Sequence, residues 1–253
     1  MPNAVDLVFA AIVFVAGAFL DYFVLWPYLL RKVGVGDAGA RTRVYGIIMA
    51  WLWLATIFVA VRWWLLARPW TALWLGPPRG WRLLPSMLAV LAGAALWLLQ
   101  SRALTRLSAE KRAALRQRSG HLLPLAPHTT AEYRWWVCVS VTAGICEELL
   151  YRGFLVWALR HWVGLGWAAT VSVIVFGAGH AYQGKDVVRP TLAGVVLQGI
   201  ALLTQSLLPG IVVHAMLDVM SGTSGYNLLR DFAQAAQSAP SSGLSTAQTG
   251  QKP

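Results

Sequence analysis

Residues 44–66 read VYGIIMAWLWLATIFVAVRWWLL, and Arg62 is the one charged side chain in this run. A helix needs about 20 mostly apolar residues to cross the hydrocarbon core of a bilayer. The run meets this requirement and predicts a membrane-spanning helix. By the same rule the sequence predicts six more spans, at 5–30, 83–99, 135–158, 163–182, 191–208 and 209–228.

The composition also indicates a membrane protein. Of the 253 residues, 57% are hydrophobic and 12% are charged, whereas soluble domains have about 25% charged residues. So few polar residues cannot cover a water-soluble core of this size. We therefore expect an all-α, polytopic membrane helix bundle of about seven spans. Cys138 and Cys146 both lie in apolar sequence, which excludes a secreted disulfide scaffold.

Two local signals refine the spans. The dipeptide Pro209-Gly210 separates the last two and predicts a tight helical hairpin, because Pro stops one helix and Gly permits the turn. Ala16-Gly17-Ala18 resembles a signal-peptide cleavage site. The segment before it lacks a basic region and carries Asp6, so we interpret the first apolar run as a retained span.

Basic residues lie mainly in the connections between spans. The formal net charge is +11, and most Lys and Arg side chains fall in alternate connections. Lys and Arg are enriched in cytoplasmic loops, so we expect the N-terminus outside and the C-terminus in the cytoplasm. Anionic lipid is the expected partner of these loops. Nucleic acid is not, because its binding needs basic residues gathered on a folded, water-facing surface.

The chain divides into four regions by composition. Residues 1–99 form a three-span region, 100–134 a basic cytoplasmic loop, 135–228 a four-span core, and 229–253 a tail that we expect to be disordered because it is rich in Ser, Ala, Gln and Gly. Within the basic loop, residues 101–118 predict either a short helix on the inner membrane surface or a solvated linker.

Ionisable residues within spans are costly, so they usually face a cavity or a partner. The fourth span contains Glu147-Glu148-Leu149-Leu150-Tyr151-Arg152, the fifth Phe176-Gly177-Ala178-Gly179-His180, and the seventh His214-Ala215-Met216-Leu217-Asp218. Outside these clusters the clear intramembrane charges are Asp21 and Arg62, which could pair with each other or reach the membrane surface.

In the fourth span, Glu148 and Arg152 have the spacing of a helical ion pair. That pair leaves Glu147, about 100° around the helix, without a local counter-charge. An uncommitted carboxylate suits the role of general base. In the alternative interpretation, both Glu residues share Arg152 in a buried structural network.

The two histidines differ in strength as signals. His180 alone is more typical of a packing or interfacial residue, whereas His214 and Asp218 share a helix face on which the carboxylate could fix the imidazole tautomer. Two His and one uncommitted Glu on three separate spans predict a convergent polar site inside the bundle.

At these residues the sequence resembles the CPBP intramembrane proteases, also called the Abi family, which include CAAX proteases and bacteriocin-processing enzymes. Their pattern is Glu-Glu-x-x-x-Arg, then Phe-x-x-x-His, then His-x-x-x-Asn or Asp, and all three motifs occur here in order over about residues 140–222. The resemblance implies a multi-pass endopeptidase, of a bacterial plasma membrane, that cleaves a peptide or membrane-protein substrate, with 135–228 as its catalytic core.

The resemblance also implies roles for the motif residues. Glu147 would activate a water, His180 would position it, and His214 with Asp218 would stabilise the oxyanion. Glu148, Arg152 and Phe176 would support them. Residue 218 is Asp rather than Asn, and an ionised Asp cannot donate a hydrogen bond, so we expect Asp218 to orient His214.

Metal dependence stays open at the level of sequence. Glu147, His180 and His214 could supply three zinc ligands with water as the fourth. The zinc-type motif His-Glu-x-x-His is absent from the sequence, and the resemblance favours a metal-free, glutamate-type site. We therefore expect no cofactor, with Zn as the alternative.

Two other functions compete with proteolysis. A non-catalytic membrane scaffold or bacteriocin-immunity protein could keep the same polar cluster for stability. A transporter could relay protons through intramembrane Glu and His, but the sequence shows no inverted repeat.

The predicted span boundaries conflict with a common site at one point. At about 1.5 Å per residue, Glu147 and His214 have similar depths, whereas His180 falls close to the inner end of its span. Either that helix runs further, or residues 182–186 dip into a water-filled funnel. We expect Glu147, His180 and His214 to line one cavity that opens to the cytoplasm.

Overall fold

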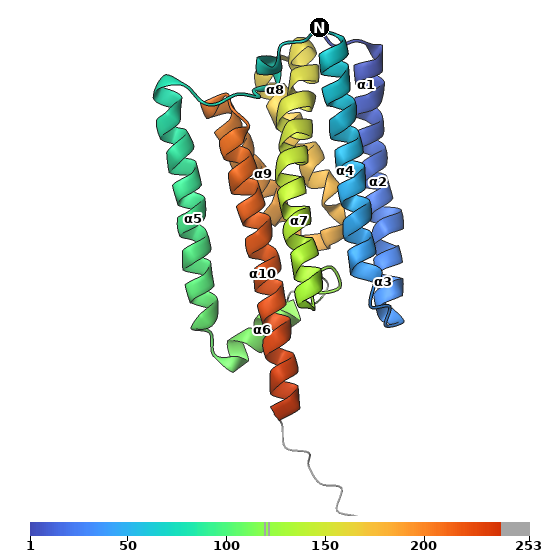
Figure 1. The fold of residues 1–253 in the computed structure, drawn as a ribbon, viewed down its shortest axis with the longest axis vertical. Helices are drawn as coiled ribbons and strands as arrows, with labels where there is room; N and C mark the ends of the chain where they lie inside the picture. The colour runs from blue at the N-terminus through green and yellow to red at the C-terminus, as the bar shows by residue number, and fades with distance from the viewer. Residues whose placement is uncertain (119, 121, 239–253) are drawn as a thin grey trace, which may run out of the picture.

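The computed structural model describes residues 1–118, 120 and 122–238, and this part of the chain is a bundle of helices without β-strands (Figure 1). The α-helices are α1 (Ala4–Ala11), α2 (Gly17–Leu20), α3 (Trp26–Gly34), α4 (Ala40–Leu65), α5 (Leu83–Thr105), α6 (Ala109–Arg118), α7 (Thr130–Glu147), α8 (Val156–Gly179), α9 (Val188–Thr204) and α10 (Leu208–Ser238). The π-helical segments are η1 (Ile12–Ala16), η2 (Asp21–Leu25) and η5 (Glu148–Leu155), and the 3₁₀ segments are η3 (Trp70–Leu73), η4 (Gly80–Arg82) and η6 (Ala181–Val187). The expected all-α membrane bundle is confirmed.

The first span is one long rod in which α-helical and π-helical turns alternate from Ala4 to Gly34. Asn3 begins it with a capping box, since its side chain accepts a hydrogen bond from the Asp6 N–H and its own N–H donates to the Asp6 carboxylate. A π turn carries one extra residue per hydrogen-bonded ring and re-aims the side chains that follow it.

The segment Thr130–Gly179 is continuous by hydrogen bonding but contains two antiparallel helices. The chain reverses at Gly164, whose φ of 77° and ψ of 166° are accessible to glycine. The Ser172 hydroxyl then donates to the Tyr151 carbonyl at 2.9 Å, which fixes the returning helix against η5. The described part of the chain thus contains seven long helical segments, as the sequence predicts.

Five helical segments are long and apolar enough to cross a membrane within the described residues: Ala4–Gly34, Ala40–Leu65, Gly80–Thr105, Thr130–Gly179 and Ala181–Thr204. The fourth of these includes both helices of the reversal at Gly164. The last helix, α10, is not among the five because it carries the polar residues His214 and Asp218 and the run Ser221-Gly222-Thr223-Ser224-Gly225.

The last hairpin forms, but its turn does not lie at Pro209-Gly210. The preceding helix ends at Thr204, and Gln205 makes the turn in the left-handed conformation with φ 47° and ψ 36°. Pro209 lies in the first turn of α10, where a missing N–H costs nothing. The predicted boundary is therefore wrong by about one turn.

The connection between α8 and α9 resolves the conflict over the depth of His180. The helix before His180, α8, ends at Gly179, so the alternative in which this helix runs further is wrong. From Gly164 it covers about 22 Å, which is shorter than a bilayer core of about 30 Å. The turn between α8 and α9 accordingly lies above the lower end of the bundle, where α3 ends and α7 begins (Figure 1).

Two other boundaries differ from the expected ones. The third span continues to Thr105, and α6 follows as a separate helix within the segment 101–118, so this segment is not a plain linker. At the other end, α10 runs to Ser238, into the region expected to be a tail. The rest of that region, 239–253, lies outside the described residues.

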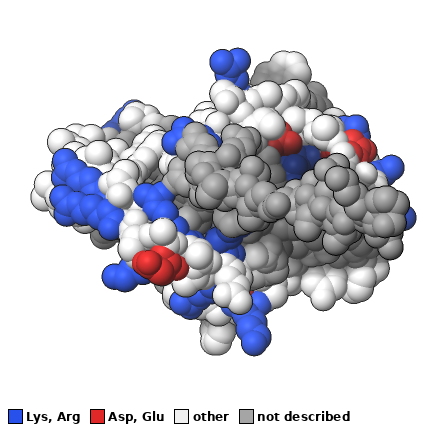
Figure 2. All heavy atoms as spheres, turned by 90° about the horizontal axis from the view of Figure 1, so that it is seen from below, with Lys and Arg blue, Asp and Glu red and all other residues white. Residues whose placement is uncertain are grey.

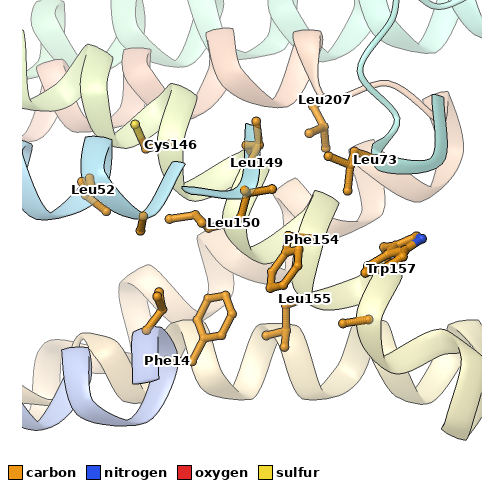
Figure 3. Close-up of a cluster of buried hydrophobic side chains, with 14 of the residues drawn as sticks. Phe14, Leu52, Leu73, Cys146, Leu149, Leu150, Phe154, Leu155, Trp157 and Leu207 are labelled. Carbon is orange, nitrogen blue, oxygen red and sulfur yellow. The ribbon is translucent and has the colours of Figure 1, made fainter. Parts of the chain in front are cut away.

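The main apolar core lies between the first span, α4, α7, η5 and the loop after α4 (Figure 3). Its labelled members are Phe14, Leu52, Leu73, Cys146, Leu149, Leu150, Phe154, Leu155, Trp157 and Leu207. The loop after α4 is fixed to the hairpin before α10, because the Leu207 N–H donates to the Trp74 carbonyl at 3.0 Å. In lipid such contacts stabilise by close packing rather than by removal from water.

The intramembrane charge Arg62 does not pair with Asp21. Its guanidinium lies 3.2 Å from Asp6, and Arg68 lies 2.6 Å from the same carboxylate. Arg68 also stacks over the rings of Trp63 and Trp157. This buried network joins the first span to α4 and α8, and it leaves Asp21 for another role.

Lys and Arg side chains gather at the end of the bundle where α3 ends and α6 lies, which we call the basic end (Figure 2). The opposite end holds the N-terminus, the loop after α4 and the turn before α10 (Figure 1). The connections at the basic end are the ones in which the sequence contains most of the Lys and Arg residues.

Candidate active site

The Glu-Glu motif lies where the α-helix α7 changes into the π-helix η5. Glu147 is the last residue of α7 and Glu148 is the first of η5. Single π turns inside helices are frequent at functional sites, because the widened turn displaces side chains from regular helical positions. Here it separates the environments of two consecutive carboxylates.

Glu148 is fully buried and bound from two sides. Its Oε1 lies 3.2 Å from Arg152 Nη1 and 2.9 Å from His214 Nδ1. The Arg152 guanidinium also donates to the Gly194 carbonyl at 3.4 Å and stacks over the Phe176 ring at 4.2 Å. The ion pair expected between Glu148 and Arg152 is therefore present within the first motif. The contact between Glu148 and His214 connects the first motif to the third.

Glu147 faces the other nitrogen of the same imidazole. Its Oε2 lies 3.7 Å from His214 Nε2, beyond hydrogen-bond distance. Arg152 forms its ion pair with Glu148, and none joins it to Glu147 among the described residues. The alternative in which both Glu residues share Arg152 is thus not the arrangement observed, and Glu147 stays uncommitted.

The imidazole of His214 is oriented by Glu148 rather than by Asp218. Asp218 Oδ2 lies 3.6 Å from Nε2, which is too long for a hydrogen bond. The bond from Nδ1 to Glu148 leaves Nε2 facing both Glu147 and Asp218. The expected orienting role of Asp218 is therefore performed by a residue that the sequence places on another span.

His180 joins the site through the second motif. Its Nδ1 lies 2.8 Å from the Phe176 carbonyl oxygen, and a carbonyl can only accept, so Nδ1 is the donor. In the neutral ring Nε2 is then an acceptor. The Phe176 ring lies 4.7 Å from the His180 ring and 5.9 Å from the His214 ring, so it packs against both imidazoles.

Close helix contacts hold these elements at the required distances. A Cβ at Gly144 would lie 2.9 Å from the Ile211 carbonyl, and one at Gly210 would lie 3.0 Å from Glu148 Oε2. A Cβ at Gly194 would lie 2.9 Å from the Phe176 ring. Glycine at these positions allows α7, α9 and α10 to approach the motif residues.

A cavity of about 290 Å³ lies beside the site, between the first span, α4 and the motif helices. Glu147 and His180 line it, as expected, whereas His214, which was expected to line it as well, is not part of its wall. Leu29, Val44 and Leu125 also line the cavity, so it extends towards the basic end.

The cavity also contains residues that sequence reasoning did not assign to the site. Asp21, Trp26 and Trp51 come from the first span and α4, and Tyr151 and Tyr182 come from the motif region. Asp21 could have been assigned to the site from the sequence, because it is a charged residue within a span. The aromatic residues carried no such signal, since they are common in apolar spans.

The proposed zinc ligands do not form a metal site. Among residues 1–118, 120 and 122–238, no three His, Cys, Asp or Glu side chains are arranged to hold a metal ion. His180 and His214 each use Nδ1 for a hydrogen bond, so the atoms offered to a metal would be Nε2 of each ring and the Glu147 carboxylate. As they lie in the described part of the chain, Glu147, His180 and His214 do not form a three-ligand metal site.

Fold and site define a polytopic helical membrane protein with a buried Glu, His and Asp cluster beside a cavity. Residues 129–220 match the family model Rce1-like, described as Type II CAAX prenyl endopeptidase Rce1-like. The match includes all three motifs, confirms the expected resemblance and indicates a protease at the family level. No match was found among curated proteins or among solved structures.

Proposed function

We propose that this protein is an intramembrane endopeptidase in which Glu147 is the general base. The observation that carries the proposal is the different state of the two neighbouring carboxylates. Glu148 is bound to Arg152 and His214, whereas Glu147 lines the cavity and forms no hydrogen bond with any other residue that the structure describes. A base must be free to take a proton from water, and Glu147 meets that condition.

The reaction follows from this placement. A water in the cavity attacks the peptide carbonyl carbon while Glu147 takes one of its protons, which gives a tetrahedral oxyanion. The C–N bond then breaks, and Glu147 returns the proton to the leaving nitrogen. The Nε2 acceptor of His180 orients the water. His214 uses Nδ1 to donate to Glu148, so its ring must be protonated at both nitrogens for Nε2, which faces Glu147, to donate to the oxyanion.

The substrate is a peptide segment of a protein that reaches the cavity from the basic end. The cavity walls are mostly apolar, which suits an extended segment with apolar side chains. The matched family is described by its action on CAAX prenyl proteins. A prenylated C-terminus is therefore one candidate substrate, and an unmodified membrane protein is the other.

The location and lipid contacts belong to the same proposal. We place the basic end in the cytoplasm of a bacterial cell, because the cytoplasmic loops of membrane proteins are enriched in Lys and Arg and these side chains gather at that end (Figure 2). At that end α6 carries Lys111, Arg112, Arg116 and Arg118 on a helix oblique to the bundle (Figure 1). Anionic headgroups are its expected partners.

The experiment compares membranes from cells that express the wild type or Glu147→Gln and identifies new peptide termini by mass spectrometry. Gln has the size of Glu but cannot take a proton, so the cleavage products should disappear while the protein still accumulates. His161→Ala is a matched control, because this exposed residue lies near the reversal at Gly164, far from the motifs. Identical termini in wild type and Glu147→Gln would support a non-catalytic scaffold.

The metal-free form of the proposal has its own test. Purified protein in detergent should keep its activity after treatment with a strong zinc chelator and removal of the chelated metal. Loss of activity that added Zn²⁺ restores would instead support the zinc alternative, with the same three residues as ligands.

A further inference from the structure

Asp21 is a carboxylate in the catalytic cavity that the proposed mechanism does not use. It lies on the first span, at the start of the π-helical segment η2, and it lines the same cavity as Glu147 and His180. The match to the protease family begins only at residue 129, so Asp21 is contributed by a part of the chain outside the matched region.

No counter-charge accompanies Asp21. Within the described ranges, no side chain forms a hydrogen bond or ion pair with it, and Arg62, which could have paired with it, is bound to Asp6. The described cavity wall contains no Lys or Arg side chain. An ionisable residue within a membrane span usually faces a partner or a functional cavity, and Asp21 faces this cavity.

The groups around Asp21 suit a cation. Trp26, Trp51, Tyr151 and Tyr182 all line the cavity, and the rings of Trp26 and Tyr182 lie 5.4 Å apart. Aromatic faces attract ammonium and guanidinium groups, and a carboxylate nearby adds a direct ion pair. An anionic group of a ligand would be repelled at the same place.

We propose that Asp21 binds a positively charged side chain, Lys or Arg, of the peptide substrate and so determines which segments are cleaved. The inference rests on the proposed proteolytic function, which it deepens by naming a substrate feature. Asp21 is a specificity residue in this scheme, and the chemistry stays with Glu147 and its neighbours.

The first test measures cleavage. The new termini found in wild-type membranes should have Lys or Arg enriched close to the cleaved bond. For a peptide cleaved by the wild type, Asp21→Asn should lower kcat/KM about tenfold or more when Lys is present. Asp21→Asn should leave kcat/KM unchanged when that Lys is acetylated. Asp21→Glu keeps the charge and should retain most of the wild-type kcat/KM. Glu110→Gln removes one exposed carboxylate on α6 and is the control for net charge.

The second test does not depend on catalysis. The Glu147→Gln protein, with or without Asp21→Asn, is titrated with n-octylammonium and with n-octanol while thermal stability is followed. We expect Asp21→Asn to weaken n-octylammonium binding about tenfold and to leave n-octanol binding unchanged.

The outcomes separate the two proposals. Absence of any Glu147-dependent cleavage contradicts the proteolytic function, and the binding titration then decides the role of Asp21 alone. Equal n-octylammonium affinity with and without Asp21→Asn overturns the inference. Two further results overturn it. One is that the Glu147-dependent cleavage sites have no Lys or Arg nearby. The other is that Asp21→Asn lowers kcat/KM equally for the Lys peptide and the acetyl-Lys peptide.

Discussion

The Oε1 atom of Glu148 lies 2.9 Å from His214 Nδ1, although the two residues are 66 positions apart in the chain. The same oxygen lies 3.2 Å from Arg152. One buried carboxylate therefore orients the imidazole on α10 and neutralises the guanidinium on η5. The second Glu of the motif thus links two helices, while the first lines the cavity.

This network predicts a large loss of stability when one member is removed. Glu148→Gln and Arg152→Ala should each lower the free energy of unfolding by about 3–5 kcal/mol, because the remaining charge is buried without its partner. Thermal unfolding in detergent measures the effect. Arg189→Ala is the control, since its pair with Asp186 is exposed and should contribute about 0–1 kcal/mol.

The double variant Glu148→Gln/Arg152→Met sharpens the result. It removes both charges, so its loss should be smaller than the sum of the single losses. Strictly additive losses would mean that the two residues act independently, contrary to the contact seen here.

His214→Ala should affect turnover more than binding. The His214 Nε2 atom faces Glu147, but the ring is not part of the cavity wall, so it contributes little to substrate contact. Loss of an oxyanion donor typically lowers kcat by about 10²–10³. Steady-state kinetics on a cleaved peptide measures kcat and KM separately, and an effect confined to KM would argue against this role.

Asp218→Asn should be the mildest change among the motif residues. Asp218 lies 3.6 Å from His214 Nε2 without a hydrogen bond, and the ring is already held by Glu148. We expect kcat to fall by less than about tenfold. A loss as large as that of His214→Ala would show that the charge of Asp218 itself takes part in the reaction.

The sequence predicted the helical class, the seven helical segments and the three motifs because each of these depends on local patterns. It found one neighbour of His214 and missed the other, because helical spacing reveals Asp218 at i+4 but not Glu148, which contacts His214 across a helix interface. The turn at Gln205 was missed because a non-glycine residue in the left-handed conformation leaves no sequence signal. Of the two alternatives for Arg62, the pair with Asp21 does not form, because Arg62 contacts Asp6 on another helix, which local spacing does not reveal.

Gly144 should be intolerant of a side chain. A Cβ there would meet the Ile211 carbonyl at 2.9 Å and the Ala215 N at 3.1 Å, and backbone atoms cannot move aside as a flexible side chain can. Gly144→Ala should lower stability by about 1–3 kcal/mol and reduce activity, because it separates Glu147 from His214.

The control is Gly46→Ala on α4. No atom lies within 4 Å of a Cβ built there, so this change should be neutral or stabilise by about 0.5–1 kcal/mol through helix propensity. Thermal unfolding of both variants makes the comparison. If Gly144→Ala left stability unchanged, α7 and α10 would not be in the close contact described at Gly144.

The direction in which the cavity opens can be tested by chemical labelling. Val24 lines the cavity on the first span, and the cavity extends to Leu125 near the start of α7, at the basic end. With that end in the cytoplasm, a thiol at Val24→Cys in a Cys138→Ala/Cys146→Ala background should react with a membrane-impermeant reagent in inside-out vesicles and be protected in intact cells. Arg79→Cys, in the loop before α5 at the opposite end, should show the reverse pattern. Labelling of Val24→Cys from the outside would invert the topology, and protection from both sides would mean that water does not enter the cavity, which would remove the source of the attacking nucleophile.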